Sequence, residues 1–378
     1  MKKKICILGS TGSIGISTLD IVYKNKKDFS VLLLSGNTNY KLLISQAIRF
    51  KPKYIYSNNF FLIEKIKYYC KNNKIIIIND LNLLKKIKFD ITISAISGIA
   101  GLLPTLNIIK YSKKILIANK ESIICGWRFI SKELKKNNCS FSPIDSEHFS
   151  ISNLIKNKNK NTIKKIYLTA SGGPFFVKVI NLKKVTPDQA VKHPNWKMGK
   201  KISIDSANLM NKILEVIEAS LIFNLPLNKF KIIIHPQSLI HAIVEFRNGL
   251  SSMLYHNNDM KIPIANSLYN NFYIHKEVSN KFFSKNLSFY NPTIDKFPSI
   301  KILSQKKILN EIGYILITVL NEILVERFLN NRILFTDIVY KLLEILKSKV
   351  VINYLKNNKI RHINDVYNTY NFSRSLLN

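Results

Sequence analysis

The chain has 378 residues, of which 58 are Lys or Arg against 23 Asp or Glu, and its formal net charge is +35. A hydrophobic content of 46% excludes an intrinsically disordered chain, and the length exceeds what one hydrophobic core usually organises. The lysines are spread along the whole chain, so we expect a solvated surface that steers small anions and no dedicated nucleic-acid face.

The cysteines and the N-terminus indicate the compartment. Cys6, Cys70, Cys125 and Cys139 contain no CxxC pair, which favours neither a disulfide framework nor a zinc site. "MKKKICILGS" is too short in its apolar run for a signal peptide, and no later segment has the roughly eighteen apolar residues of a membrane span. We therefore expect a soluble, cytoplasmic protein without a membrane partner.

The first third of the chain alternates short apolar runs with segments of helical spacing. The runs include "KICIL", "VLLLSG", "YIYS", "KIIIIN", "ITISAIS" and "KILIAN", and the helical patterns include "ISTLDIVYKN" and "YKLLISQAIRF". Continuous apolar strands that alternate with helices predict a parallel sheet covered on both faces, in an α/β fold.

A glycine-rich segment, "GSTGSIG" at 9–15, follows the first predicted strand and precedes the first predicted helix. Glycines there let the backbone turn tightly and approach a pyrophosphate, which the N–H groups of a helix start stabilise. The motif is a variant of the dinucleotide fingerprint and favours a nicotinamide cofactor over a plain βα turn. This predicts a Rossmann-like sheet.

The second predicted strand ends at "SGNTN", where an NAD-specific site usually offers Asp or Glu to the ribose hydroxyls. No acid is present there, and Asn37, Thr38 and Lys41 are the polar neighbours. The segment therefore favours NADP.

The stretch "IDSEH" at 144–148 places two carboxylates directly after an apolar run. In an extended chain Asp145 and Glu147 project to one side and Ser146 to the other. Two carboxylates that close repel each other unless a cation lies between them, so the pair predicts a divalent metal site.

The segment "KISIDSANLMNKILEVIEA" at 201–219 offers a third acid. If a helix starts at Ser206, then Asn208, Asn211, Lys212 and Glu215 share one face. Two Asn and a Lys near a helix start suit a phosphate, and Glu215 could complete an all-oxygen metal shell. Ligands without Cys or His suit Mg²⁺ or Mn²⁺.

Three further segments are candidates for a substrate site, in a region where antiparallel pairing enters the sheet, although each could also be purely structural. "TASGGPF" places Ser171 in a Gly-rich turn, and "HPNWKMGKK" at 193–201 has the composition of a lid over substrate. In "HPQSLIH", His235 and His241 are more often structural than catalytic. The Asn248-Gly249 dipeptide predicts a hairpin.

The remaining chain predicts a linker and a helical end. Residues 271–298 carry Pro292 and Pro298 and little periodicity, whereas "ILNEIGYILITVLNEILVERFLNN" and "FTDIVYKLLEILKS" have helical spacing. We therefore expect a cofactor domain at 1–144, an α+β catalytic domain at 145–270, a linker at 271–298 and a helical domain at 299–378.

These segments, in this order, resemble the 1-deoxy-D-xylulose 5-phosphate reductoisomerase family. The resemblance covers nearly the whole chain and is carried by "ILGSTGSIGISTLD", "GLLPTL", "ANKES", "PIDSEH", "SGGPF", "TPDQAVKHPNWKMGKKISIDSANLMNK", "LEVIEA", "IHPQSLIH" and "FTDI". It implies a homodimer that uses NADPH and Mg²⁺ or Mn²⁺. The implied reaction is a metal-assisted rearrangement of the sugar phosphate, followed by hydride transfer that gives 2-C-methyl-D-erythritol 4-phosphate for isoprenoid synthesis.

The resemblance also assigns residues. The implied metal ligands are Asp145, Glu147 and Glu215. The implied NADPH contacts are Thr11, Gly12, Ser13, Ile14, Gly36, Asn37, Thr38, Asn119, Glu121 and Gly199. The implied substrate contacts are Lys120, Ser146, Ser171, His193, Trp196, Ser206, Asn211, Lys212 and Glu215, with Met198 in the lid. The candidate catalytic residues are Lys120, Glu147 and His193.

Two other readings compete with this one. Another two-domain NAD(P)-dependent dehydrogenase, acting on an aldehyde or semialdehyde, would need neither a divalent metal nor a phosphorylated ketose. A basic nucleotide- or RNA-binding protein would retain RNA in a salt-sensitive way without binding NADPH.

Overall fold

The computed structural model describes residues 1–84, 87–177, 181–194, 196, 199–274 and 286–377. The chain forms two compact units. The first contains Met1–Ile123, Trp127–Phe149 and Met260–Lys276, and the second contains Ile124–Gly126, Ser150–Asp259 and Glu277–Asn378. The predicted division into three domains and a linker stays a prediction.

The described part of the first unit is built on a seven-stranded parallel sheet in the order β4-β3-β2-β1-β5-β6-β7. Its strands are β1 (Lys3–Leu8), β2 (Phe29–Ser35), β3 (Tyr54–Tyr56), β4 (Ile76–Ile78), β5 (Phe89–Ser94), β6 (Ser112–Ile117) and β7 (Ser140–Pro143). The prediction of a parallel sheet is confirmed. Strands that are apolar on both faces are typical of parallel sheets, because helices cover both sides of such a sheet.

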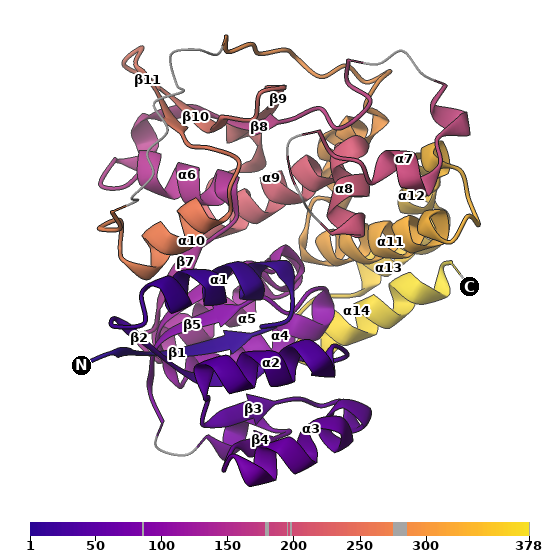
Figure 1. Ribbon diagram of the computed structural model, residues 1–378. Coiled ribbons are helices and arrows are strands. Elements are labelled where there is room, and N and C mark those ends of the chain that lie inside the picture. The colour runs from indigo at the N-terminus through magenta and orange to yellow at the C-terminus, as the bar shows by residue number, and fades with distance from the viewer. Residues whose placement is uncertain (85–86, 178–180, 195, 197–198, 275–285, 378) are drawn as a thin grey trace. The chain divides into compact units, whose positions relative to one another are not determined.

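Helices connect these strands, as Figure 1 shows in indigo to magenta. They are α1 (Ser13–Lys24), α2 (Tyr40–Phe50), α3 (Phe60–Asn72), α4 (Leu102–Ile109) and α5 (Lys120–Lys136). The core between sheet and helices includes Ile5, Ile7, Leu34 and Leu43, all fully buried. The strand order reverses at β1, whose neighbours are β2 and β5, so the carboxyl ends of β1 and β5 form the switch point where such sheets bind ligands.

A later segment returns to this unit. Helix α10 (Lys261–Leu268) packs against α1, and Ile264 and Leu268 belong to the same core. Lys261 Nζ lies 3.1 Å from Asp20 Oδ2. Residues 261–268 therefore pack with the N-terminal sheet although they lie more than a hundred residues after it in the sequence.

The described part of the second unit contains a mixed four-stranded sheet in the order β11-β10-β8-β9. Its strands are β8 (Ile163–Ala170), β9 (Phe230–Ile234), β10 (Ile240–Phe246) and β11 (Ser251–Tyr255). Strands β8 and β9 are parallel, whereas β10 is antiparallel to both β8 and β11. The predicted hairpin at Asn248-Gly249 is confirmed, with Gly249 at φ 86°.

Helices make up most of the rest of this unit. They are α6 (Ser146–Leu154), whose first residues belong to the first unit, α7 (Pro187–Ala190), α8 (Lys200–Ala207), α9 (Met210–Phe223), α11 (Glu311–Leu329), α12 (Phe335–Lys347), α13 (Lys349–Asn357) and α14 (Ile363–Ser375). Helix α9 packs on β8 and β9, and α11 packs against α8, α9, α12 and α14. The predicted helical end is confirmed.

Part of the segment predicted as a linker adds to the edge of the mixed sheet. Ile234 donates its N–H to the Tyr290 carbonyl at 2.8 Å, and Tyr290 returns a bond to the Ile234 carbonyl at 2.9 Å. Residues 275–285 of the same segment lie outside the described residues. None of the helices within the described part of the chain combines the length and apolar composition needed to cross a membrane.

Candidate active site

The glycine-rich segment forms a tight turn between β1 and α1. Gly9 has φ 82°, and a Cβ there would lie 2.5 Å from the Ala95 carbonyl oxygen. A Cβ on Gly15 would lie 2.4 Å from the Gly9 carbonyl oxygen, so only glycine lets α1 start this close to the turn. Gly12 caps α1 without a side-chain bond, which leaves the first N–H groups of the helix available to a phosphate.

The loop after β2 lies at the same edge of the sheet. A Cβ on Gly36 would lie 3.1 Å from Leu43 and 3.5 Å from the Thr11 methyl group, so the two predicted cofactor segments approach each other here. Asn59, the cap of α3, donates from Nδ2 to the Asn37 carbonyl at 2.7 Å and holds the loop in place.

Asn119 occupies the cap of α5 and holds the loop after β5. Its Oδ1 accepts from the Ser122 N–H at 2.9 Å, and its Nδ2 donates to the Gly98 carbonyl at 2.8 Å. The next residue, Lys120, is 8% exposed, and its Nζ lies 3.5 Å from Asp145 Oδ2. The structure thus brings the predicted substrate residue Lys120 to a predicted metal ligand.

The segment around Asp145 corrects one prediction. It is not extended, because α6 begins at Ser146 and Asp145 Oδ1 accepts from the Glu147 N–H at 3.2 Å, as a helix cap does. Ser146 does not face away from Glu147 but donates its hydroxyl to Glu147 Oε2. The two acids still lie together, at the end of β7 and the first turn of α6.

His148 accompanies this pair. It is fully buried, and its Nδ1 lies 3.0 Å from Asp145 Oδ1. Asp145 therefore has a cation, Lys120, on one oxygen and an imidazole on the other. These two contacts fix the orientation of the Asp145 carboxylate.

The predicted phosphate-binding helix lies in the second unit, and its predicted start is wrong. A helix was predicted to begin at Ser206, but α8 ends at Ala207 and α9 starts at Met210. Leu209 between them has φ 68°, and Asn208 Oδ1 accepts from the Met210 N–H at 3.0 Å. Asn208 is therefore a turn residue and shares no helical face with Glu215.

Asn211, Lys212 and Glu215 do lie on one face of α9. Lys212 Nζ is 2.6 Å from Glu215 Oε2, and Asn211 Nδ2 donates to Glu215 Oε1. Glu215 is 1% exposed and Lys212 is 7% exposed. A buried carboxylate is tolerable only with such partners, so the three side chains act as one polar unit.

A second polar group joins the Gly-rich turn after β8 to α8. His193 Nε2 lies 2.8 Å from Ser171 Oγ and 3.1 Å from Ser206 Oγ. The Trp196 N–H donates to His193 Nδ1 at 3.0 Å, so the neutral imidazole carries its proton on Nε2 and can donate it. Burial first, and then the charge of Lys212, lowers the pKa of His193 to about 4.

The remaining predicted residues are less constrained. Gly199 caps α8, and a Cβ there would meet no atom within 4 Å. Met198 lies outside the described residues. His235 stacks on Phe289, and His241 stacks on His256 with ring centroids 3.8 Å apart, so both form aromatic packing contacts of the kind expected of structural histidines.

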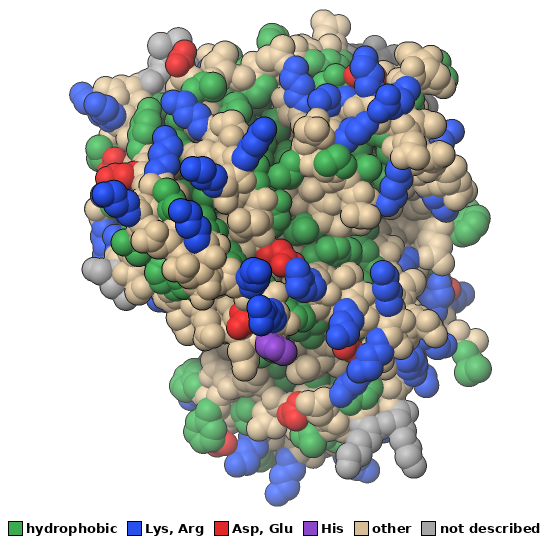
Figure 2. Space-filling view, turned by 180° about the vertical axis from the view of Figure 1, so that it is seen from behind, with side chains coloured by type: hydrophobic (Ala, Val, Ile, Leu, Met, Phe, Trp, Pro, Cys, Tyr) green, Lys and Arg blue, Asp and Glu red, His purple; other side chains and the backbone are tan. Residues whose placement is uncertain are grey.

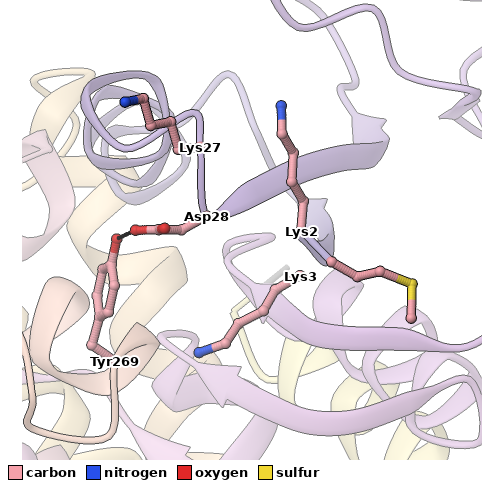
Figure 3. Close-up of a pocket in the computed structure, with 6 residues that line it drawn as sticks. Lys2, Lys3, Lys27, Asp28 and Tyr269 are labelled. Carbon is pink, nitrogen blue, oxygen red and sulfur yellow. Dashed lines mark hydrogen bonds between the residues drawn. The ribbon is translucent and has the colours of Figure 1, made fainter.

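A pocket in the first unit lies elsewhere. It has a volume of about 550 Å³ and is lined by Met1, Lys2, Lys3, Lys27, Asp28 and Tyr269. Figure 3 shows Tyr269 pointing at Asp28, to which its hydroxyl donates at 2.6 Å. The pocket is at the amino ends of β1 and β2, whereas parallel sheets bind ligands at the carboxyl ends. It is therefore separate from the Gly-rich turn.

A parallel sheet that presents a glycine-rich turn at its switch point defines a dinucleotide-binding α/β protein. Family models agree with this class and narrow it. The model of 1-deoxy-D-xylulose 5-phosphate reductoisomerase matches residues 5–126, and two models of the C-terminal domain of that enzyme match residues 141–223 and 256–376.

Full-length relatives carry the same name. A 1-deoxy-D-xylulose 5-phosphate reductoisomerase of Pelagibacter ubique is 46% identical, with 97% of this chain and 96% of the relative covered. One from Sulfurihydrogenibium is 40% identical, with 96% and 94% covered. The chain therefore belongs to the 1-deoxy-D-xylulose 5-phosphate reductoisomerase family, as its motifs predict.

Solved structures agree. The reductoisomerase of Zymomonas mobilis in complex with NADPH has a TM-score of 0.88 and 31% identity, with 100% of this chain and 98% of that chain covered. A reductoisomerase in complex with NADPH, fosmidomycin and magnesium has a TM-score of 0.89 and 32% identity, with 99% and 98% covered. The predicted fold class is confirmed.

Proposed function

We propose that this chain is an NADPH-dependent reductoisomerase that converts 1-deoxy-D-xylulose 5-phosphate to 2-C-methyl-D-erythritol 4-phosphate in isoprenoid synthesis. The observation that carries the proposal is 46% identity over 97% of the chain with a relative named for this activity. The residues of the two units give the proposal its chemistry.

NADPH would bind the turn between β1 and α1. The N–H groups at the start of α1 favour its pyrophosphate, in the segment that includes Thr11, Gly12, Ser13 and Ile14. Gly36, Asn37 and Thr38 would contact the adenosine end, because their loop is held beside Thr11. Asn119, Glu121 and Gly199 complete the proposed set. Asn37 occupies a position where the family often has a basic residue, so the preference for NADPH would rely on Lys41 and on the absence of an acid in 36–39.

Asp145, Glu147 and Glu215 would hold one Mg²⁺ or Mn²⁺. The fit rests on their chemistry, since all three offer carboxylate oxygens, which hard divalent ions prefer. Glu147 and Glu215 are 8% and 1% exposed, and a bound divalent ion would offset the cost of burying both carboxylates. When bound, the ion would polarise the carbonyl of the substrate.

Residues of α8, α9 and the turn after β8 would hold the substrate phosphate. Ser171, Ser206 and Asn211 offer neutral donors and Lys212 offers a charge, while Nε2–H of His193 adds a further donor. This binding energy, remote from the reacting carbons, would orient the sugar for both steps. Trp196 would cover the site and exclude water.

Lys120 and Glu147 would contact the reacting end of the substrate, and with His193 they are the proposed catalytic residues. Lys120 is held by Asp145, so its ammonium can donate to a hydroxyl or carbonyl oxygen placed beside the acids. Ser146 donates its hydroxyl to Glu147 Oε2, and it would contact the substrate beside that acid.

The assembly and compartment belong to the same proposal. We propose a homodimer, as the family resemblance implies, in the cytoplasm. The four cysteines are buried and form no disulfide within the described part of the chain, which suits a reducing compartment.

The test follows NADPH absorbance in the presence of 1-deoxy-D-xylulose 5-phosphate and Mn²⁺, with and without a chelator. We expect NADPH oxidation that requires both the sugar phosphate and the metal. Glu215→Gln removes one charge from the proposed shell at constant shape and should lower kcat/KM at least about a hundredfold.

Glu245→Gln is the matched control. Glu245 is on β10 of the same unit, where it bonds Lys164 at 2.7 Å and Tyr167 at 3.0 Å, away from the proposed ligands. The Glu245→Gln variant should keep the wild-type kcat/KM for NADPH oxidation. Turnover that persists in chelator, or that Glu215→Gln leaves intact, would refute the proposed function.

A further inference from the structure

Gln46 is a buried polar residue on α2 that no motif includes. Its side chain is 6% exposed and bonds Ser10, the second residue of the glycine-rich turn. Gln46 Nε2 donates to the Ser10 carbonyl at 2.8 Å, and Ser10 Oγ donates to Gln46 Oε1 at 2.7 Å. Both amide atoms are therefore committed to one residue of the turn.

Ser10 is also bonded to the end of β2. Its N–H donates to the Ser35 carbonyl at 2.9 Å, and its hydroxyl lies 2.9 Å from the same oxygen. Ser35 Oγ accepts from the Gly9 N–H at 2.7 Å. The Ser10 hydroxyl has one hydrogen to share between Ser35 and Gln46. Among the described residues, the side chain that donates to the Ser10 carbonyl is that of Gln46.

The position of Ser10 fixes the start of α1. A Cβ on Gly15 would lie 2.5 Å from Ser10 Cα, so the helix and Ser10 are in close contact. The Gly12 N–H donates to the Gly9 carbonyl at 3.1 Å and closes the turn around Ser10. A shift of Ser10 would therefore move the N–H groups that face the proposed pyrophosphate.

We propose that Gln46 is a positioning residue for NADPH. It holds the Ser10 carbonyl away from the ligand side of the turn and so keeps the first N–H groups of α1 directed at the pyrophosphate. The inference rests on the proposed function, because it concerns the cofactor of that reaction. It assigns to α2 a role in cofactor affinity besides packing on the sheet.

The test is Gln46→Met, which keeps the shape of the side chain and removes both hydrogen bonds. We expect the Kd of NADPH, measured by titration of the purified protein, to rise about tenfold, since one buried carbonyl loses its partner. At saturating NADPH, kcat and the KM for the sugar phosphate should stay within about twofold of the wild type.

Thr92→Val is the matched control. Thr92 is fully buried on β5 of the same sheet, and its Oγ1 lies 2.6 Å from Ser112 Oγ, so the variant also loses a buried hydrogen bond. Thr92 also bonds the Cys6 side chain on β1, and neither of these partners belongs to the glycine-rich turn at 9–15. The NADPH affinity of the variant should therefore be unchanged. If Gln46→Met does not fold, Ser10→Ala, which loses only the hydroxyl, should raise the Kd about threefold.

Three results would overturn the inference. The first is an NADPH affinity of Gln46→Met equal to that of the wild type. The second is an equal loss in Thr92→Val, which would make the effect one of general stability. The third, a wild-type protein that does not bind NADPH, would overturn the proposed function as well, and is recognised because it appears before any substitution.

Discussion

His193 shows how its surroundings set the state of one side chain. Burial, with the nearby charge of Lys212, lowers its pKa to about 4, so the imidazole is neutral at pH 7. The Trp196 N–H occupies Nδ1 and leaves Nε2–H to donate toward Ser171 and Ser206. Because the imidazole stays neutral, its Nε2–H can donate to a phosphate oxygen, and the binding does not depend on protonation of His193 near neutral pH.

The low pKa has a consequence for stability. Between pH 6.5 and about 4 the unfolded chain binds a proton at His193 that the folded chain does not, so folding stability falls as the pH falls through this window. His193→Gln removes this contribution. Between pH 7 and pH 4.5 the variant should lose less stability than the wild type, by about 1 kcal/mol after allowance for solvent screening.

Urea unfolding at the two pH values measures this difference. The buried His235 and His256 also have lowered pKa values, mainly from burial, but they are present in both proteins and cancel in the comparison. An equal loss of stability in wild type and variant would contradict the assigned state of His193.

Residue identities around the acids were predictable, but their local geometry was not. Asp145 and Glu147 signal a metal by their type and spacing, yet the spacing fits an extended segment as well as the helix cap that Asp145 forms. The break before α9 was not predicted, because a leucine with positive φ, such as Leu209, is rare. The role of Gln46 could not be predicted either, because it is a single polar residue on an amphipathic helix and belongs to no motif.

At the scale of elements, the C-terminal helices support the proposed phosphate site through α8. Asn321 on α11 is fully buried and donates from Nδ2 to Asp205 Oδ1 at 2.8 Å, and Lys201 Nζ lies 3.3 Å from the other oxygen of Asp205. Asp205 is 2% exposed and directly precedes Ser206. The helical end of the chain thereby fixes the helix that presents Ser206.

Asn321→Leu tests this support. The variant leaves a buried carboxylate without one of its donors and should destabilise the protein by about 2 to 3 kcal/mol. Because α8 loses an anchor, the KM for the sugar phosphate should also rise a few-fold while the Kd of NADPH stays the same. Unfolding experiments and steady-state kinetics measure both effects.

Thr318→Val is the matched control on the same helix. Thr318 is 1% exposed, and its hydroxyl donates to the Tyr314 carbonyl of the same helix at 2.8 Å. The Thr318→Val variant should lose about 1 kcal/mol of unfolding free energy, without any change in the KM for the sugar phosphate. An unchanged KM for the sugar phosphate in Asn321→Leu would contradict the prediction that α11 supports the substrate site.

The order of elements was predictable because it follows from local patterns. Strands such as β1 and β2 contain continuous apolar runs, and turns such as Asn248-Gly249 have specific chemistry. The return of α10 to the N-terminal sheet was not predictable, since its packing on α1 depends on contacts between residues far apart in sequence. The pairing of Tyr290 with Ile234 was missed for the same reason.

Across the whole molecule, basic residues far outnumber acidic ones, so a group of three acids such as Asp145, Glu147 and Glu215 is unusual. Lys and Arg side chains are scattered over the face in Figure 2, and the net charge is +35. In such a field a small anion such as a sugar phosphate is attracted from any direction. A divalent cation is repelled unless several carboxylates lie together, and we propose that Asp145, Glu147 and Glu215 hold one ion.

Titration of the full chain with Mn²⁺ at constant ionic strength, with bound ion measured directly, tests that claim. We expect one tightly bound Mn²⁺ per chain in the wild type and in Glu245→Gln, and at least about tenfold weaker binding in each of Asp145→Asn, Glu147→Gln and Glu215→Gln. Binding of Mn²⁺ by Glu215→Gln with wild-type affinity would contradict it, because the ion would then need the acids of the first unit alone.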